Sequence, residues 1–520
     1  MKAIDRLVVI RYKSERKNKF THKNLFRILE KDDIWIIAYE NLQNKKEICA
    51  TSNETPYKKN VKQLTKLREQ VINEHYPFKR VNKNIGKQLT YCRRRLELEL
   101  INNKIVQEII CLILEAIYES DFSEQSFGFQ HKRGLHTAFK YIDRKFCWIN
   151  WVLENKIKNT ACKIDYKQLY IQLCVKIQDI RFLNLINKLL NSKILKKVDF
   201  DHLSFDVLQG NSLLKMLLNI YYNKLDKWVE KKIEKFYKDQ IKNQKIIYNK
   251  LFGQIEKIVN QIKILDKKSI TYKIFLKKLK FLEQKKYRIS NCSKKSTKIV
   301  YVRYASKWII GIQGKRNFAN RLKENITRFL NKQFKQINCN LKLTIIHLIS
   351  RKIKFLGYEI YISRNKKINS YKKSHFPTMY KIKPRLRFTI SIQTILNQLE
   401  KRGYIKKLVK GYRALSKSNY TRLDDVIIIK NFRSVWLRLI HFYSGCTNLS
   451  KLQYIYSLLY MSCVMTLSHR HRSNIKKIFT KHGKNLIITT GKINTNFPYR
   501  INWSVKNRKW QTKQHFFNLF

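Results

Sequence analysis

The sequence is poor in glycine and proline, with 13 and 5 of them among 520 residues. β-sandwiches, collagen-like chains and linker-rich chains contain more of both, so these classes are disfavoured and long helices are favoured. Apolar residues reach 44 % and aromatic residues 12 %, which is enough material for a buried core. At a usual domain size of roughly 100–200 residues, the length predicts two to four domains.

Acidic residues are the second deficiency, because 36 Asp and Glu stand against 110 Lys and Arg, a formal net charge of +74. A compact body with this excess repels itself unless a polyanion neutralises it. Nucleic acid is the usual partner, since each phosphate contact releases a condensed counterion. AT-rich codon usage and a ribosomal-type protein are the plainer explanations. Codon usage does not account for the scarcity of Asp and Glu, so we expect a nucleic-acid partner.

The ten cysteines are scattered singly, without a C-x-x-C pair. This pattern argues against a zinc ribbon or a disulfide framework, so we expect reduced core thiols, no metal and no cofactor. The longest apolar runs, such as 109–113 and 426–429, fall far short of the ~20 residues that span a bilayer, so no membrane partner is expected. The N-terminus contains acidic residues and no apolar signal core, unlike an import or secretion signal. With the AT-rich usage, this favours synthesis inside an organelle.

Apolar periodicity predicts most of the elements. The expected helices are 61–75, 95–119, 179–190, 212–232 and 319–334, followed by a mainly helical region at 390–484. The Lys-rich residues 229–297 keep apolar positions three to four apart, which predicts an amphipathic helical hairpin. The expected strands are 161–166, 298–304, 308–312 and 353–362. Residues 1–34 have the composition of a basic leader. The basic residues 363–387 contain two prolines and are expected to form a linker.

Eight motifs, in this order along the chain, resemble those of group II intron reverse transcriptases/maturases. They are Trp35…Ala38-Tyr39…Asn44-Lys45, Lys104-Ile105-Val106-Gln107-Glu108…Glu115-Ala116-Ile117-Tyr118-Glu119, Ser126-Phe127-Gly128-Phe129…Arg133…His136, Ile164-Asp165, Asp179-Ile180-Arg181-Phe182-Leu183, Gln209-Gly210…Asn219-Ile220-Tyr221…Leu225-Asp226, Val302-Arg303-Tyr304-Ala305 and Phe355-Leu356-Gly357-Tyr358. Near the C-terminus, Thr466-Leu467-Ser468-His469-Arg470-His471…His482-Gly483-Lys484 is similar to the box that closes the maturase X domain. The resemblance extends over residues 35–490.

The resemblance implies an α/β (α+β) fold, with right-hand polymerase-like fingers and palm followed by an all-helical thumb and maturase X domain. The implied domains are a basic N-terminal extension at 1–60, a degenerate reverse-transcriptase fingers and palm at 61–362 that contains the Lys-rich insertion 229–297, the basic linker 363–387, the thumb and X domain at 388–490, and a C-terminal tail at 491–520. The tail has no H-x-x-H or cysteine cluster, so the DNA-binding and endonuclease domains of mobile relatives are not expected.

The residues that correspond to the polymerase site lack most of its carboxylates. Two-metal polymerisation needs clustered carboxylates at the reacting phosphate. The resemblance matches Asp165 to the palm-strand Asp, whereas the family's Tyr-Ala-Asp-Asp turn here reads Tyr304-Ala305-Ser306-Lys307. Ser306 is a weak ligand and the Lys307 ammonium repels divalent cations. We therefore expect these five residues to be vestigial and the chain not to be an enzyme, with Lys307 either paired with Asp165 or solvated.

Three basic surfaces are candidates for phosphate contacts. The finger surface comprises Lys79, Arg80, Arg93, Arg94 and Arg95, for which a solvated charge run is the alternative. The linker surface comprises Lys372, Lys373, Lys381, Lys383, Arg385 and Arg387, and Phe388 beside it is expected either to stack on a base or to pack locally. The X-domain box comprises His469, Arg470, His471, Arg472, Lys476, Lys477, Lys481 and Lys484. Positions 470, 477, 481 and 484 are expected to share one helical face. Asp424-Asp425 indicate a helix start rather than a site.

The resulting hypothesis is an intron maturase that binds group II or group II-derived intron RNA, in the first place the intron that encodes it, and assists its folding and splicing without polymerising. An active reverse transcriptase for intron mobility and a general organellar RNA chaperone remain the alternatives. A plastid is the favoured compartment and a mitochondrion the alternative. The sequence favours no particular oligomeric state.

Overall fold

The computed structural model describes residues 2–16, 20–44, 56–78, 90–130, 133–157, 165–192, 212–264, 270–292, 297–333, 341–363, 385–409, 411–490, 493–495 and 497. This part of the chain is mostly helical and contains small antiparallel sheets, in agreement with the predicted α/β (α+β) class. None of its helices is long and apolar enough to cross a membrane.

The N-terminal helices are part of the main core. They are α1 (Ala3–Arg16), α2 (Phe26–Leu29), α3 (Asp32–Asn44), α4 (Pro56–Ile72) and α5 (Thr90–Tyr118). Helices α4 and α5 confirm those expected at 61–75 and 95–119. Leu29, Trp35 and Ala38 are almost fully buried against the apolar face of α5 and its neighbours. The interpretation of residues 1–34 as a basic leader was therefore wrong, because their apolar side chains complete the first core.

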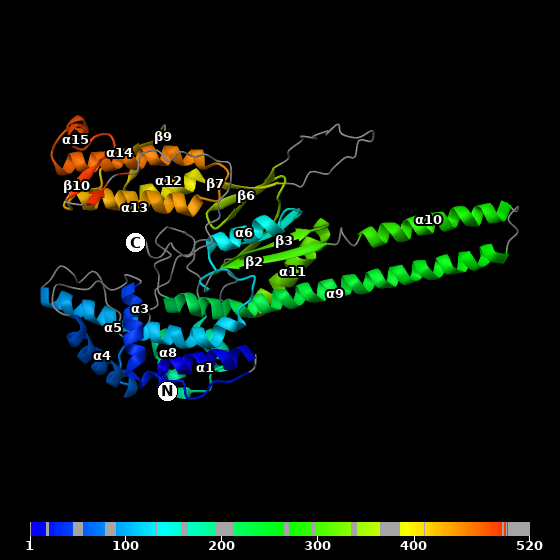
Figure 1. Cartoon of the computed structure of the whole chain (residues 1–520), viewed down its shortest axis with the longest axis horizontal. Coiled ribbons are helices and arrows are strands. Elements are labelled where there is room, and N and C mark those ends of the chain that lie inside the picture. Colours follow the sequence, from blue (N-terminus) through cyan, green and yellow to red (C-terminus); the bar gives the residue numbers. More distant parts are fainter. Residues whose placement is uncertain are drawn as a thin grey trace.

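The central sheet has the strand order β2-β3-β1-β4, with every neighbour antiparallel. Its strands are β1 (Trp151–Ile157), β2 (Lys298–Tyr304), β3 (Lys307–Gln313) and β4 (Leu341–His347). Because side chains alternate along a strand, Tyr301 and Ile310 enter the core of the N-terminal helices, whereas Val302 and Ile309 enter the core of the C-terminal half. The sheet thus separates two hydrophobic cores (Figure 1).

Helices surround this sheet on both sides. They are α6 (Leu135–Lys145), α7 (Tyr166–Cys174), α8 (Ile180–Asn191) and α11 (Arg316–Gln333). Helices α8 and α11 lie where 179–190 and 319–334 were expected to be helical. The strand expected at 161–166 is wrong at its described end, since Asp165 caps α7 and Tyr166 begins it. The remainder of that strand lies outside the described residues.

A long helical arm projects from the body (Figure 1). Helix α9 (Ser212–Ile264) runs from the core into the arm and α10 (Ile270–Cys292) returns beside it. Leu251, Ile258 and Leu282 form a small core between the two helices. The amphipathic hairpin is thereby confirmed, except that 212–232 and its first half form one continuous helix.

The C-terminal half combines helices with short strands. A three-stranded sheet contains β5 (Ile353–Phe355), β6 (Tyr358–Ser363) and β7 (Arg385–Ile390), and the single strand expected at 353–362 is in fact the β5–β6 hairpin. Leu356 and Gly357, at φ +49° and +82°, form its two-residue loop. Residues 385–387 belong to β7 rather than to a linker, because they pair with β6.

The prediction of an all-helical C-terminal domain was wrong. Its helices are α12 (Ile392–Lys401), α13 (Asp425–Tyr443), α14 (Leu452–Arg470) and α15 (Ile475–His482). The hairpin β8 (Ile405–Leu408)–β9 (Gly411–Ala414) lies between α12 and α13, and the hairpin β10 (Ile488–Thr490)–β11 (Ile493–Thr495) follows α15. Gly403 and Gly411 adopt φ of +74° and +105°, which permits the chain to leave α12 and turn back between β8 and β9. Asp424 and Asp425 begin α13, as expected.

Candidate nucleic-acid interface

The Tyr304–Lys307 turn is a tight β-hairpin loop. Tyr304 pairs with Lys307, leaving Ala305 and Ser306 as the loop, and Ala305 has a φ of +54°. The side chain of Asn155 on β1 holds the loop from the neighbouring strand. Its amide donates to the Ser306 carbonyl at 3.0 Å, and its oxygen accepts from the Trp308 backbone N–H at 3.0 Å. Ser306 itself is buried at 1 % exposure. The turn is therefore a packed structural element.

A second loop, formed by Ser126–Phe129, closes over this turn. The backbone N–H of Phe127 donates to the Arg303 carbonyl at 2.8 Å, and that of Arg303 donates to Gln125 at 3.0 Å. A Cβ atom on Gly128 would lie 2.4 Å from the backbone nitrogen of Ala305. Only glycine permits such a close approach of two backbones. This explains why a glycine stands in that motif.

A buried ion pair ties the turn to α9. The Arg303 Nη2 atom lies 2.7 Å from Asp226 Oδ2, and both side chains are completely buried. Tyr301 also donates to Asp226, at 2.7 Å, and Asn219 links Arg303 to the Gly128 carbonyl. Burial alone would lower the pKa of Arg303, but the Asp226 carboxylate outweighs it and raises that pKa above its usual value. Asn219, Asp226 and Arg303 all lie in the sequence motifs, but the sequence did not indicate that they contact one another.

The Asp165 carboxylate does not lie on the strand beside the turn, where the sequence predicted it. Asp165 is the N-cap of α7, and its side chain accepts from the backbone N–H groups of Lys167 and Gln168. The strand hydrogen-bonded beside the turn is instead β1, where Glu154 pairs with Ile309. The assignment of Asp165 to the palm strand was therefore wrong. The signal for β1 was present in the run Trp151–Ile157, whose buried polar residues Glu154 and Asn155 obscured it.

The X-domain box is divided between two helices. Helix α14 ends at Arg470, Arg472 has a φ of +46°, and α15 begins after Asn474. Positions 470, 477, 481 and 484 therefore cannot share the face of one helix, as we expected, because the chain turns between them. Five basic residues of the box are exposed on and around α15: Arg472, Lys476, Lys477, Lys481 and Lys484.

The other three members of the box make contacts within the protein. The exposed His469 is hydrogen-bonded through Nδ1 to Ser416 at 3.1 Å. Arg470 lies 2.9 Å from Asp425, and His471 Nε2 lies 2.7 Å from the other oxygen of the same carboxylate. Arg470 and His471 thus bind the first residue of α13 and stabilise the start of that helix.

The finger and linker surfaces are described only in part. Lys79 and Arg80 lie outside the described residues, and the backbone of residues 93–95 lies in α5 while their side chains are not described. Lys372, Lys373, Lys381 and Lys383 also lie outside them. Arg385 and Arg387 are in β7, and Arg387 is half-buried. Phe388 is fully buried against Phe139, so local packing rather than base stacking accounts for it.

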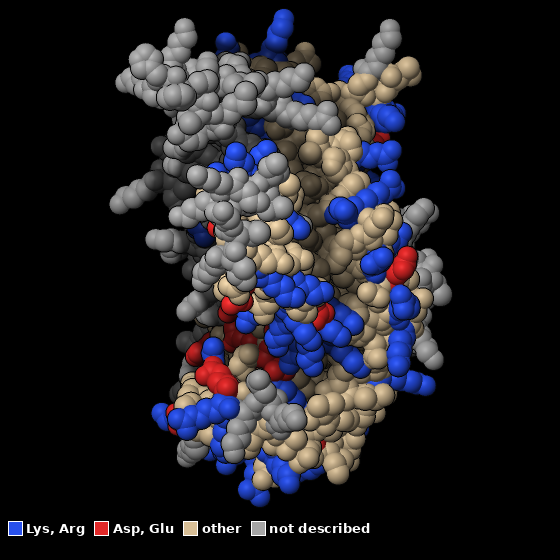
Figure 2. Space-filling model, turned by 90° about the vertical axis from the view of Figure 1, so that its right-hand side faces the viewer, with Lys and Arg blue, Asp and Glu red and all other residues tan. Residues whose placement is uncertain are grey.

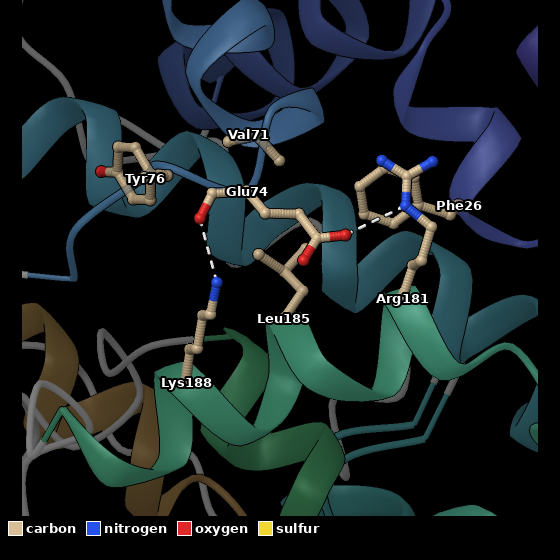
Figure 3. A pocket seen from close by; sticks show the side chains of 7 residues that line it. All are labelled: Phe26, Val71, Glu74, Tyr76, Arg181, Leu185 and Lys188. Carbon is tan, nitrogen blue, oxygen red and sulfur yellow. Dashed lines mark hydrogen bonds and ion pairs between the residues drawn. The ribbon is translucent and has the colours of Figure 1, made fainter.

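A small pocket lies between α8 and the segment that follows α4 (Figure 3). Its groups already interact with one another. The Arg181 guanidinium lies 3.0 Å from Glu74 and 4.0 Å from the centre of the Phe26 ring, and Lys188 donates to the Glu74 carbonyl at 2.9 Å. We assign it no ligand.

On the face that includes the tip of the arm, Lys and Arg are scattered among the other residues and form one large patch below the centre, whereas Asp and Glu occur in a few places (Figure 2). On the arm itself, Lys286 lies over the rings of Tyr248 and Phe252, at 5.4 and 5.0 Å from their centres. Cations interleaved with exposed aromatics suit a polyanion that also offers flat bases. The described surface thus combines many cations with exposed aromatic rings on the arm.

Comparison with known proteins relates this chain to intron-encoded proteins and maturases. Residues 383–514 match the family described as Type II intron maturase. The group II intron-encoded protein LtrA of Lactococcus lactis subsp. cremoris is 27 % identical over 93 % of this chain and 80 % of its own length. The putative COX1/OXI3 intron 1 protein of Saccharomyces cerevisiae is 28 % identical over 95 % of this chain and 58 % of its own length. Maturase K of Angiopteris evecta is 25 % identical over 93 % and 91 %. Over most of its length the chain is therefore similar to group II intron-encoded proteins and to a maturase K, and its C-terminal part matches the maturase family model.

Proposed function

We propose that this chain is a splicing maturase, which binds group II intron RNA and stabilises the folded, splicing-competent form of that RNA without polymerising nucleotides. The observation that carries the proposal is the overlap between the matched maturase domain and the exposed basic residues of α15. A group II intron is itself a ribozyme, so its protein partner has only to supply phosphate contacts and shape recognition.

The proposed architecture is a right hand, in which residues 61–362 are fingers and palm, 388–490 are thumb and X domain, and 229–297 are the inserted arm. Two features support it. The antiparallel sheet β2-β3-β1-β4 bears the Tyr304–Lys307 hairpin, and helices enclose it on both sides (Figure 1). The N-terminal helices pack with α5, so residues 1–60 would act as part of the fingers rather than as an extension.

The absence of polymerase activity is the second part of the proposal. Ser306 is buried in the loop, and the Asn155 amide on β1 contacts its carbonyl. Lys307 contributes an ammonium at the position next to it. Two divalent cations need several anionic oxygens at one point. These residues provide hydrogen bonds and a positive charge there instead.

Three surfaces are proposed to contact RNA: the exposed box residues on and around α15, the finger surface and the linker surface. The arm is charged in the same sense and adds aromatic rings. The host intron is the proposed target. We assign the protein to a plastid on its similarity to Maturase K of Angiopteris evecta, with a mitochondrion as the alternative through the COX1/OXI3 relative.

Ultraviolet crosslinking of the protein in its organelle, followed by sequencing of the attached RNA, tests this function. The proposal predicts crosslinks concentrated in group II intron sequences, with the host intron foremost. Crosslinks spread over transcripts in proportion to their abundance would indicate a general RNA chaperone and contradict it.

A further inference from the structure

Three metal-ligating side chains meet where α13, α14 and α15 join. Asp425 is the first residue of α13, His471 follows α14, and His482 ends α15. One ligand atom from each lies within 4.8 Å of the other two. The Asp425 Oδ2 atom is 2.7 Å from His471 Nε2 and 3.7 Å from His482 Nε2. The three ligands thus come from three helices that are separate in the sequence.

The His482 imidazole differs from the other two side chains, because no hydrogen bond within the described ranges accounts for the position of its Nε2 atom. Its side chain is only 8 % exposed, and its Nε2 atom finds no hydrogen-bond partner among the described residues. A buried polar nitrogen left without a partner costs free energy. It nevertheless points toward the Asp425 carboxylate. Burial lowers the pKa of His482 below its usual value, despite the neighbouring Asp425 carboxylate.

The surroundings hold the carboxylate in position for a ligand. Arg470 Nε lies 2.9 Å from Asp425 Oδ1, whereas the two histidines approach Oδ2, and Arg470 Nη2 lies 3.3 Å from Asp424. Metal-ligating carboxylates are commonly held in this way by a second partner. In the described part of the chain, this is the one group of His, Cys, Asp and Glu with metal-ligand spacing.

We propose that Asp425, His471 and His482 bind a Zn²⁺ ion, with a fourth position open to water. Two imidazoles and one carboxylate are a donor set that Zn²⁺ favours. Ligand atoms around a tetrahedral Zn²⁺ stand about 3.3 Å apart, given bonds near 2.0–2.1 Å. The observed 2.7 and 3.7 Å lie on either side of that spacing, and all three ligand atoms lie within 4.8 Å of one another, so side-chain rotations that even out these distances would complete the site. By binding all three side chains, the ion links α15 to α13 and α14. The exposed lysines of the box lie on and around α15. This inference does not depend on the splicing function.

Metal titration of the full chain tests the proposal. The protein is stripped with a chelator and titrated with Zn²⁺ in competition with a chromophoric chelator, and with Co²⁺ in a parallel absorption experiment. We expect one equivalent of Zn²⁺, and tetrahedral Co²⁺ bands without thiolate charge transfer. His482→Gln and Asp425→Asn should each weaken this binding by more than the roughly 10- to 100-fold effect of disturbing an outer-sphere partner.

His469→Gln is the matched control, because His469 belongs to the same box but bonds to Ser416. It should bind Zn²⁺ as the wild type does. Melting curves of the metal-free proteins identify variants that do not fold, and His482→Gln is expected to melt like the metal-free wild type. Zn²⁺ affinity unchanged in His482→Gln, or Co²⁺ bands that report thiolate ligands, would overturn the proposal.

Discussion

Arg303 and Asp226 form an ion pair in which both side chains are completely buried, with Nη2 and Oδ2 2.7 Å apart. Arg303 lies on β2, the strand that leads into the Tyr304–Lys307 turn, and Asp226 lies on α9, the helix that continues into the arm. Tyr301 and Asn219 add hydrogen bonds to the same pair. The pair therefore fixes the hairpin to the helix that supports it, even though the turn lacks metal-binding carboxylates.

Removal of one partner should be costly. Asp226→Ala leaves the Arg303 guanidinium buried without its counter-charge, so the free energy of unfolding should fall by about 3–5 kcal/mol. The double variant Arg303→Met with Asp226→Leu should lose less, because neither charge remains buried. Urea unfolding followed by tryptophan fluorescence measures this, with the exposed Asp239→Ala on the same helix as control. Equal midpoints for Asp226→Ala and Asp239→Ala would show that the pair does not stabilise the fold.

Gly128 permits a test of the loop that covers the turn. Gly128→Ala places a methyl group 2.4 Å from the Ala305 backbone nitrogen, so the two loops must separate, at a cost of about 1–3 kcal/mol. Gly253→Ala is the matched control, since its methyl group meets nothing within 4 Å in the helical arm. That change should stabilise the helix by roughly 0.5–1 kcal/mol. Thermal melting of the two variants should shift in opposite directions, and a shift of the same sign would contradict the packing described.

The purified protein should not extend a primer on an RNA template with Mg²⁺ or Mn²⁺. Restoring the turn by Ser306→Asp with Lys307→Asp should not create activity either, because the Asp165 carboxylate is engaged in capping α7 rather than placed on β1. Incorporation of labelled nucleotides measures both proteins. Template-dependent extension by the wild type would revive the reverse-transcriptase alternative.

Two buried histidines predict acid sensitivity. Burial lowers the pKa of His22 and of His136 to about 4, whereas the pKa of a histidine in the unfolded chain is about 6.5. Between these values the unfolded chain binds more protons, so stability falls as the pH drops from 6.5 to 4 and is complete above 6.5. Each histidine should contribute up to about 1.4 kcal/mol per pH unit.

The measurement is the urea midpoint at several pH values within that window. His22→Gln, which retains a partner for the Ser14 hydroxyl, should reduce the slope of stability against pH. His75→Gln, at an exposed position, is the control and should leave the slope unchanged. Equal slopes in the two variants would assign the acid sensitivity to other groups.

Local patterns predicted the helices well. The apolar spacing of the arm, the start of α13 at Asp424-Asp425 and the strands on either side of the turn all appear as expected. In each case the signal lies within one or two elements, so a single sequence contains it.

The predictions that were wrong concern residues whose conformation depends on partners far away in the sequence. Strand β1 includes Glu154 and Asn155, polar residues that are buried only because β3, β4 and the turn surround them. The helical face expected in the box disappears because Arg472 adopts a positive φ and the chain turns there. The contacts of Arg470 and His471 likewise require α13, whose first carboxylates lie 46 residues earlier in the sequence.

Splicing of the host intron by box variants tests the central claim most directly. Lys476, Lys477 and Lys481 are exposed on α15, and replacing all three by Ala removes phosphate contacts while leaving the buried Ile478 in place. Arg321, Arg328 and Lys332 on α11 are an exposed set of equal charge, and their replacement by Ala is the control. The account predicts that intron RNA, incubated with each folded protein, splices normally with the α11 variant and poorly with the α15 variant. Normal splicing with the α15 variant, or an equal loss with both, would contradict it.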